Sequence, residues 1–232
     1  MIPFRDNIPS RTFPIVTVAL IVVNAAVFFQ ELLLGRHLTS FIQVYGLVPL
    51  RWIDSVFSLD PAALPNLVTL LTAMFLHGGW LHLIGNMWYL WIFGDNVEDY
   101  LGHIPYLGFY LICGVLGNLA HIFFNWSSTV PSIGASGAIA GVLGAYLLLF
   151  PGARVLTLIP LLIFWPIIEL PAVILLGFWF VEQFFSGFSS FAMSPQAGGG
   201  VAWFAHIGGF IAGMVLIART RRTRRRRSYS GD

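Results

Sequence analysis

Hydrophobic residues in this chain gather in long runs that polar or Gly/Pro-rich breaks separate. Six runs emerge, at residues 14–34, 69–93, 104–125, 135–150, 169–187 and 201–218. A hydrocarbon layer of about 30 Å takes about 20 helical residues to cross, so each run predicts a membrane-spanning helix. The fourth run is short for such a helix.

Two other apolar segments do not fit a simple crossing. Residues 35–68 form a long first loop in which Trp52, Val56 and Phe57 lie among charged residues, so we expect it to lie in the membrane interface. Residues 155–168 are interrupted by Pro160 and Pro166. We expect this stretch to be a re-entrant or interfacial segment that leads into the fifth helix.

The composition agrees with a membrane protein and argues against a soluble core. Hydrophobic residues make up 57% of the chain and charged residues only 9%. No charged side chain occurs at 101–152 or 184–218. The predicted fold class is therefore an all-α integral membrane protein, a six-transmembrane-helix bundle with a short fourth helix and a long interfacial first loop.

The arginines indicate how the protein is oriented in the membrane. The chain contains no lysine, and seven of its 12 basic residues lie in the stretch "RTRRTRRRR", which begins at Arg219. The positive-inside rule then places the C-terminus in the cytoplasm, and an even number of helices returns the N-terminus to the same side. We predict a multi-pass cell-membrane protein with a cytoplasmic segment at 1–13, a six-helix domain at 14–218 and a cytoplasmic tail at 219–232. The first run is long enough to remain as an anchor. Such a tail favours anionic lipid headgroups over nucleic acid.

Polar side chains inside predicted membrane helices are costly, so each is a candidate functional residue. The second helix carries "HGGWLHLIGNMWYL", in which His82 and Asn86 share a face and His77 is about 140° away from His82. The fourth helix opens with "GASG", which contains Ser136, and the sixth carries "AHIGG", which contains His206. Glycines on the fourth and sixth helices form stripes that allow close helix contact.

Depth in the bilayer predicts that these groups meet. Helix rise places Ser136 about 8 Å below the outer surface, His206 at a similar level and His82 about 10 to 12 Å deep. The stretch before Ser136, "NWSSTVPSIGA", then enters the membrane as a loop. Such a loop is tolerated where protein surrounds it or where it lines a wet cavity.

These motifs together resemble the rhomboid family of intramembrane serine proteases, over roughly residues 66–216. The resemblance implies that Ser136 is the nucleophile and His206 the general base. It also implies an oxyanion hole of His82, Asn86 and the Ser136 backbone N–H, with Gly134 beside it. "GDNVEDYLG" looks like the family as well, with Glu98 and Asp99 in structural roles.

The chemistry of these residues agrees with the resemblance. A serine hydroxyl attacks an amide only when a base takes its proton, and a neutral imidazole is such a base. No carboxylate is a candidate partner for His206, so we expect a dyad and not a triad. In some rhomboids an aromatic residue four positions after the serine stacks on the histidine, but this chain has Ala140 there. The orientation of His206 therefore stays open.

Transmembrane segments of other proteins are the predicted substrates, and no cofactor is expected. Unwinding such a helix in hydrocarbon exposes backbone groups at a cost of several kcal/mol each, so substrates prone to unwind are favoured. Access past the fifth helix makes Phe178 and Trp179 a candidate gate.

Four other interpretations compete with this one. A serine at a helix start is usually a cap or packing residue, and a lone membrane histidine is usually a packing partner. A metal site is disfavoured because HExxH is absent and His77 is turned away from His82. The main alternative is a catalytically silent rhomboid-like protein that binds transmembrane helices. A transporter is disfavoured, because this chain lacks the inverted repeats expected of one.

Overall fold

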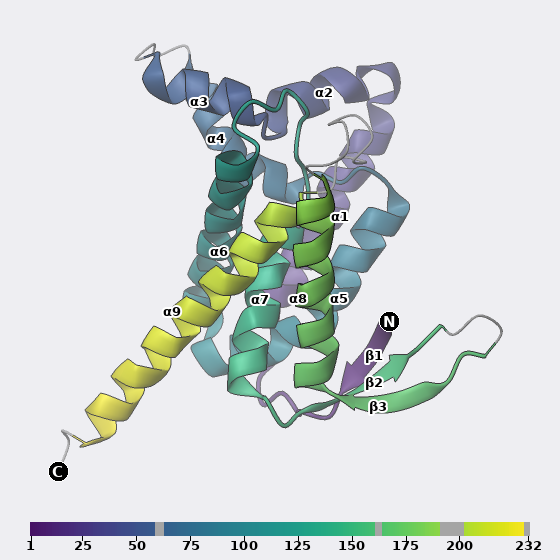
Figure 1. Ribbon diagram of the computed structural model, residues 1–232, viewed down its shortest axis with the longest axis vertical. Helices are drawn as coiled ribbons and strands as arrows, with labels where there is room; N and C mark the ends of the chain where they lie inside the picture. Colours follow the sequence, from purple (N-terminus) through teal and green to yellow (C-terminus); the bar gives the residue numbers. More distant parts are fainter. Residues whose placement is uncertain (59–62, 161–163, 191–201, 230–232) are drawn as a thin grey trace.

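The computed structural model describes residues 1–58, 63–160, 164–190 and 202–229. Within these ranges the protein is a helical bundle with one small sheet (Figure 1). The helices are α1 (Ile15–Leu33), η1 (Gly35–His37), α2 (Leu38–Tyr45), α3 (Pro49–Phe57), α4 (Leu64–Thr72), η3 (Ala73–Phe75), α5 (Trp80–Leu101), α6 (His103–Phe124), α7 (Ser136–Leu149), α8 (Ala172–Ser190) and α9 (Trp203–Tyr229). The strands are β1 (Ile2–Asp6), β2 (Arg154–Leu158) and β3 (Ile167–Pro171).

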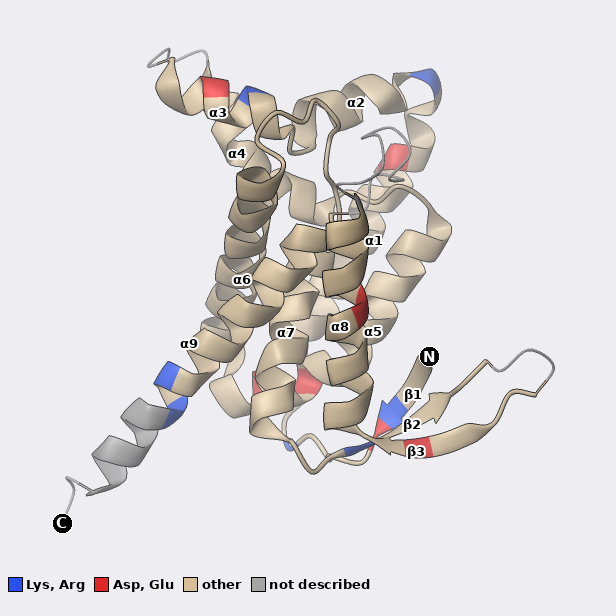
Figure 2. Cartoon of the chain, viewed as in Figure 1, with Lys and Arg blue, Asp and Glu red and all other residues tan. Residues whose placement is uncertain are grey.

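The protein is a multi-pass membrane protein by the length and hydropathy of its helices. In the described part of the chain, four helices are long and apolar enough to cross a bilayer, namely α1, α6, α8 and α9. A fifth crossing results if α4 and η3 are taken together with α5, two pieces that meet at a bend of 77°. Figure 2 shows charged residues concentrated toward the two ends of the bundle.

The second predicted helix, at 69–93, was wrong in its bounds. The chain leaves the helical conformation at Leu76, whose ψ is 148°, and α5 starts only at Trp80. Gly78 and Gly79 lie in this break, and glycine is among the poorest helix formers, which explains an interruption inside an apolar run. At its other end α5 continues to Leu101, where Gly102 with φ 86° ends it.

The short fourth helix was predicted at 135–150 and is present as α7, with 14 residues. At 1.5 Å per residue this helix is about 21 Å long, less than a bilayer core of about 30 Å. Every residue of 137–146 is buried, because α5, α6, α8 and α9 all pack around α7. The bundle therefore holds α7 and its first residue, Ser136, in its interior.

Glycines allow α7 and α9 to touch through their backbones. A side chain on Gly209 would collide with the Gly137 carbonyl, and one on Gly213 with the Gly141 carbonyl. A side chain on Gly144 would meet the Phe210 carbonyl. The glycine stripes expected from the sequence thus face each other, and this contact fixes the distance between the start of α7 and the start of α9.

The three-stranded antiparallel sheet was not predicted, because the sequence suggested an all-α fold. It has the order β1-β2-β3, with Leu156 opposite both Arg5 and Glu169. The stretch 155–168 therefore holds most of β2, the connection and the start of β3, and belongs to a β-hairpin and not to a re-entrant segment. Ile159 N–H donates to the Pro166 carbonyl across the turn, so both prolines lie at the edge of the connection, where a missing N–H costs little. Residues 161–163 lie outside the described part.

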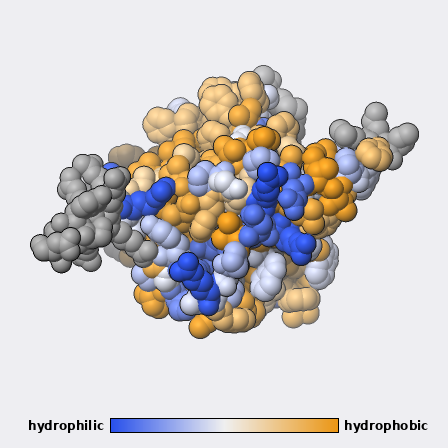
Figure 3. Space-filling view, turned by 90° about the horizontal axis from the view of Figure 1, so that it is seen from below, coloured by the Kyte–Doolittle hydropathy of each residue, from blue (hydrophilic) through white to orange (hydrophobic). Residues whose placement is uncertain are grey.

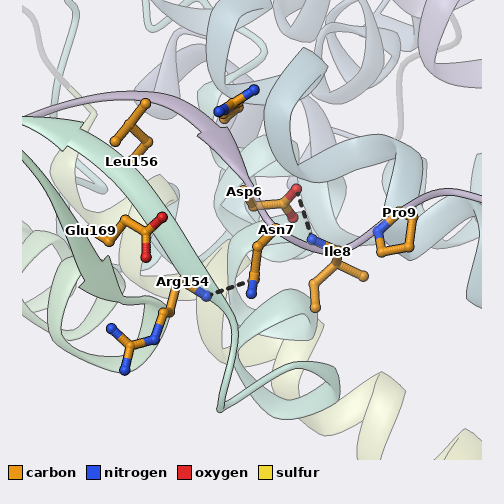
Figure 4. Close-up of a pocket in the computed structure, with 8 residues that line it drawn as sticks. Asp6, Asn7, Ile8, Pro9, Arg154, Leu156 and Glu169 are labelled. Carbon is orange, nitrogen blue, oxygen red and sulfur yellow. Dashed lines mark hydrogen bonds between the residues drawn. The ribbon is translucent and has the colours of Figure 1, made fainter.

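The N-terminal segment attaches this sheet to the bundle. The hydroxyl of Tyr146, on α7, donates to the Asp6 carboxylate, and Arg154 N–H donates to the Asn7 side chain at 2.8 Å. Figure 4 shows Asp6, Asn7 and Arg154 around a hollow of about 470 Å³ at the edge of the sheet. Seen from below, this end of the molecule gathers hydrophilic residues within a hydrophobic surround (Figure 3).

Glu98 joins α5 to α1 at the same end. Its buried carboxylate accepts the backbone N–H groups of Val16 and Thr17 at 2.9 and 2.8 Å, and it contacts His103 at 2.6 Å. A carboxylate at a helix N-terminus satisfies free N–H groups and favours the helix dipole. Asp99 accepts from Thr12 nearby. Both acids are thus part of the scaffold and lie away from Ser136.

Candidate active site

Ser136 and His206, which are 70 positions apart in the sequence, are in direct contact. Ser136 Oγ lies 2.6 Å from His206 Nε2, within hydrogen-bonding distance. Ser136 is the first residue of α7, and His206 lies in the first turn of α9. The glycine contact between the two helices therefore places a hydroxyl beside a ring nitrogen.

The loop before Ser136 is held by backbone hydrogen bonds to the rest of the protein. Leu47 and Ser132 exchange N–H to carbonyl bonds at 3.0 and 2.8 Å, and Gly134 N–H donates to the Ala73 carbonyl at 2.8 Å. These bonds pair backbone groups in the last part of the loop with protein, which is one of the two conditions under which a loop at membrane depth is tolerated. The Gly134 N–H is already used and is therefore not available to a ligand.

Gly134 has a backbone conformation and a surrounding that only glycine fits. Its φ is 132°, in the region that other residues rarely adopt, and a β-carbon there would lie 2.7 Å from His82 Nε2. The site residue Gly134 thus contributes space beside His82. The N–H of Ser136 is different, because the first N–H groups of an α-helix have no partner within the helix.

The hydrogen bond that His82 accepts determines its tautomer. Gly78 N–H donates to His82 Nδ1 at 3.3 Å, so in a neutral ring the proton resides on Nε2. Nε2 is the atom that lies beside Gly134, and His82 lines the same two cavities as Ser136. His82 therefore presents an N–H donor to the space in front of the serine.

Asn86 also presents a donor to this space. It lies one turn after His82 in α5, and its amide nitrogen lies 3.0 Å from His77 Nε2. An amide nitrogen carries two N–H groups, so a bond to His77 leaves a second N–H for the cavity.

His77 lies closer to this site than the sequence suggested. The predicted angle of 140° from His82 was wrong, because His77 precedes α5 and its ring centroid is 5.1 Å from that of His82. His77 is buried, and its backbone N–H donates to the buried carboxylate of Glu31, on α1. Glu31 thus holds the chain at the break before α5, a role that the sequence did not reveal.

The second ring nitrogen of His206 has a partner that the sequence analysis missed. His206 Nδ1 lies 2.6 Å from Gln183 Oε1, on α8, and the ring of Trp179 lies 5.9 Å from the imidazole between centroids. Gln183 and Trp179 thus contact the imidazole, whereas Ala140 offers it no aromatic ring. Of the two candidate gate residues, Trp179 packs against His206, whereas Phe178 is 58% exposed on the outside of α8.

Two adjoining cavities open onto the Ser136–His206 pair. A cavity of about 860 Å³ is lined by residues of the α4–α5 break, the loop before α7 and the start of α9. A second cavity of about 370 Å³ lies between α5 and α8 and is lined by Tyr89, Trp179 and Glu182 among others. Both are lined by His82, Asn86, Ser136 and His206. The larger of the two cavities has room for several side chains of a peptide.

This arrangement contains the parts of a serine hydrolase, and comparison with known proteins agrees with it. A Rhomboid domain matches residues 65–223, which is more than half of the chain. The chain belongs to the rhomboid family.

Individual relatives cover parts of this rhomboid domain. RHOMBOID-like protein 6, mitochondrial, of Arabidopsis thaliana is 36% identical over 150 residues, 63% of this chain and 41% of that protein. Rhomboid protein 1, mitochondrial, of Saccharomyces cerevisiae is 30% identical over 50% of this chain and 36% of its own length. Rhomboid protease GluP of Bacillus subtilis is 46% identical over 78 residues, 34% of this chain and 15% of that protein. The chain matches less than half the length of each of these relatives.

Proposed function

We propose that this rhomboid is an intramembrane serine endopeptidase that cleaves transmembrane segments of other proteins. The observation that carries the proposal is the 2.6 Å contact between Ser136 Oγ and His206 Nε2 at the edge of a cavity with two further donors. A half-buried hydroxyl and imidazole inside a membrane helix bundle are costly unless they have a role. The family membership and the similarity to a rhomboid protease support the same activity.

The proposed reaction follows from the roles of the two residues. His206 Nε2 takes the Ser136 hydroxyl proton as the oxygen attacks the carbonyl carbon of the substrate, and an oxyanion forms. His206 then gives the proton to the leaving amine, and an acyl group stays on Ser136. Water, activated by the same imidazole, releases the acyl group as a carboxylic acid and regenerates the serine.

The oxyanion of this intermediate needs donors that are already in place. We assign this role to His82 Nε2–H, the second N–H of Asn86 and the Ser136 backbone N–H. His82 and Asn86 line the cavities in front of Ser136, and the Ser136 N–H lies at the start of α7. Losing one such donor typically slows the reaction by a factor on the order of 10² to 10³. Gly134 leaves room for this group by lacking a side chain beside His82.

The orientation in the membrane is also part of the proposal. We count six crossings, with the bent pair α4–α5 and the short α7 included. The sheet and the end of α9 lie at the same end of the molecule, opposite α2 and α3 (Figure 1). Arg219 and Arg221 begin the Arg-rich tail there, and we propose that this end is cytoplasmic in a cell membrane, with the tail near anionic headgroups. The site then lies toward the outer face.

The substrate class follows from this position. Peptide in a stable helix hides its carbonyl groups, so cleavage requires local unwinding, which Gly, Pro or polar residues in the outer part of the span make easier. The cavity between α5 and α8 is the proposed lateral route for the substrate, with Trp179 lining its α8 side. Phe178, the other proposed gate residue, precedes Trp179 on the exposed surface of α8. No cofactor takes part.

The test uses purified protein in liposomes with a Gly-containing transmembrane substrate and mass spectrometry of the fragments. We expect cleavage in the outer part of the span by the wild-type protein and by Ser40→Ala, an exposed serine on α2, and none by Ser136→Ala. If the wild-type protein binds the substrate and does not cut it, the silent alternative is correct. A Leu-rich, Gly-free span cut as fast as the Gly-containing one would contradict unwinding as the selective step.

A further inference from the structure

The side of His206 that faces away from Ser136 is built from α8. Nδ1 of the ring lies 2.6 Å from Gln183 Oε1, and Gln183 is only 4% exposed. The other end of the Gln183 amide also has a partner, because Nε2 donates to the carboxylate of the preceding residue, Glu182. Glu182 is exposed and also accepts from Ser186 at 3.3 Å. A continuous chain of hydrogen bonds therefore runs from Glu182 to Ser136.

The carboxylate determines which way the amide points. A carboxylate only accepts hydrogen bonds, so the amide nitrogen of Gln183 must face Glu182 and the amide oxygen must face His206. An amide oxygen also only accepts, so Nδ1 of the neutral imidazole must carry the proton. Nε2 is then unprotonated and accepts the hydrogen bond of the Ser136 hydroxyl, which is the tautomer that a general base needs.

We propose that Gln183 is a positioning residue for His206 and that Glu182 holds its amide in the required orientation. This inference rests on the proposed protease function and deepens it. Gln183 replaces the carboxylate that lies behind the histidine in a Ser-His-Asp triad. The chain then has a serine, a base and an orienting group, with the negative charge one residue further away.

The environment explains why an amide fits this position. Gln183 is buried beside His206 and Trp179 inside a membrane helix bundle, where an unpaired carboxylate is costly. A neutral amide supplies an acceptor without that cost, and the N–H bond to a carboxylate polarises the amide oxygen. Glu182 lines the cavity between α5 and α8, where its carboxylate is exposed.

The first experiment separates an orienting role from a packing role with Gln183→Met. Methionine keeps the length and volume of the side chain and removes the acceptor. We expect kcat to fall by about 10-fold or more while KM stays within about 2-fold, because binding is intact and the base loses its tautomer. Labelling of Ser136 by a fluorophosphonate should slow in parallel. Phe185→Leu, a change on the exposed side of α8, is the matched control and should keep wild-type kcat.

The second experiment exchanges the two groups in the double variant Glu182→Gln with Gln183→Glu. The exchange keeps the composition and places a carboxylate directly against Nδ1. We expect kcat to return to within about 3-fold of wild type, unlike Gln183→Met. We also expect the acid limb of the kcat profile to move to higher pH, because an adjacent carboxylate favours imidazolium. The other ionisable groups around His206 are His82, on α5, His121, on α6, and Tyr89, which are unchanged.

The outcomes distinguish this inference from the proposed function. Wild-type protein without any cleavage overturns the protease proposal itself. Cleavage by the wild-type protein together with unchanged kcat in Gln183→Met overturns the positioning role. Circular dichroism and gel filtration show whether Gln183→Met is folded. If it is not folded, the exchange variant decides between the two roles. Loss of activity in a folded exchange variant contradicts the inference, and near-wild-type activity supports it.

Discussion

Single hydrogen bonds around Ser136 fix the protonation of each ring that the proposed reaction uses. The Gly78 N–H places a proton on Nε2 of His82, and the Gln183 oxygen places one on Nδ1 of His206. Both histidines therefore present Nε2 to the space around the serine, His82 as a hydrogen-bond donor and His206 as an acceptor. Their different roles result from neighbours on the backbone and on α8, not from any difference in the residue type.

The sequence predicted the main residues of this site and missed those that support them. Ser136, His206, His82 and Asn86 are recognisable because polar groups inside apolar helices are rare, and the structure brings them together. Gln183 belongs to the same rare class, and its place beside Glu182 in an apolar helix was the available signal. Its partner was not predictable, because the contact depends on how α8 packs against α9.

Replacing Asn86 by Ala tests the proposed oxyanion hole. We expect kcat to fall by about 10-fold or more with a much smaller change in KM, because the lost hydrogen bond forms mainly in the transition state. Steady-state kinetics on a transmembrane substrate measures both constants. Asn125→Ala, at the end of α6, is the control, because its amide bonds only to His121 of its own helix among the contacts described. A rise in KM with normal kcat would instead assign Asn86 to substrate packing.

Among the elements, hydropathy predicted the helices better than their ends. The central helix α7 was predicted nearly to the residue, because Gly134 and Pro151 flank it and its composition is uniform. The break before Trp80 lies inside an apolar run, so hydropathy gave no sign of it. The hairpin of β2 and β3 is apolar as well, and only the alternating burial of β2 and its pairing with β1 distinguish the hairpin from a membrane segment.

Helix α8 carries a proposed gate residue next to a residue that packs against His206. We therefore expect substitutions at these two neighbouring positions to change the cleavage rate in opposite directions. Phe178 is exposed on the outside of α8, whereas Trp179 packs against the His206 ring. We expect Phe178→Val to raise the cleavage rate, because less bulk remains on the exposed surface of α8, where we propose that the substrate approaches. We expect Trp179→Val to lower the rate, because His206 loses its packing. Both rates are measured on one substrate in the same liposomes, and a gain with both variants would contradict the role given to Trp179.

At the scale of the whole molecule, the prediction of a multi-pass helical membrane protein was correct, and the sheet is the main departure from it. Composition determines the class, because the chain has few charges and long apolar runs. The sheet depends on pairing between residues 2–6 and 154–158, which are far apart in the sequence. Such long-range pairing has no local signal in a short polar segment.

Asp6 connects this sheet to the central helix and gives the folded protein a pH dependence. Burial raises the pKa of the Asp6 carboxyl, although the hydrogen bond from Tyr146 opposes the shift. The stability that Asp6 contributes is therefore fully present below its unfolded value of about 3.8 and is lost as the pH rises through the higher folded pKa. We expect Asp6→Asn to raise the thermal midpoint at pH 7.5 and to lose this advantage toward pH 4.

The control for this prediction is Asp54→Asn, an exposed position on α3. Thermal unfolding in detergent, followed by tryptophan fluorescence across the pH range, measures both variants against the wild type. A midpoint of Asp6→Asn that is lower than wild type at pH 7.5 would show that the charged form of Asp6 is needed for its contacts.

The most direct test of the catalytic assignment is covalent labelling of the folded, membrane-embedded protein with a fluorophosphonate, followed by peptide mass spectrometry. The Ser136–His206 contact predicts one adduct, on Ser136, in the wild-type protein. It also predicts that the adduct is lost in Ser136→Ala and strongly reduced in His206→Ala, because the hydroxyl needs the base to react. Equal labelling of His206→Ala, or an adduct on a different serine, would contradict the account.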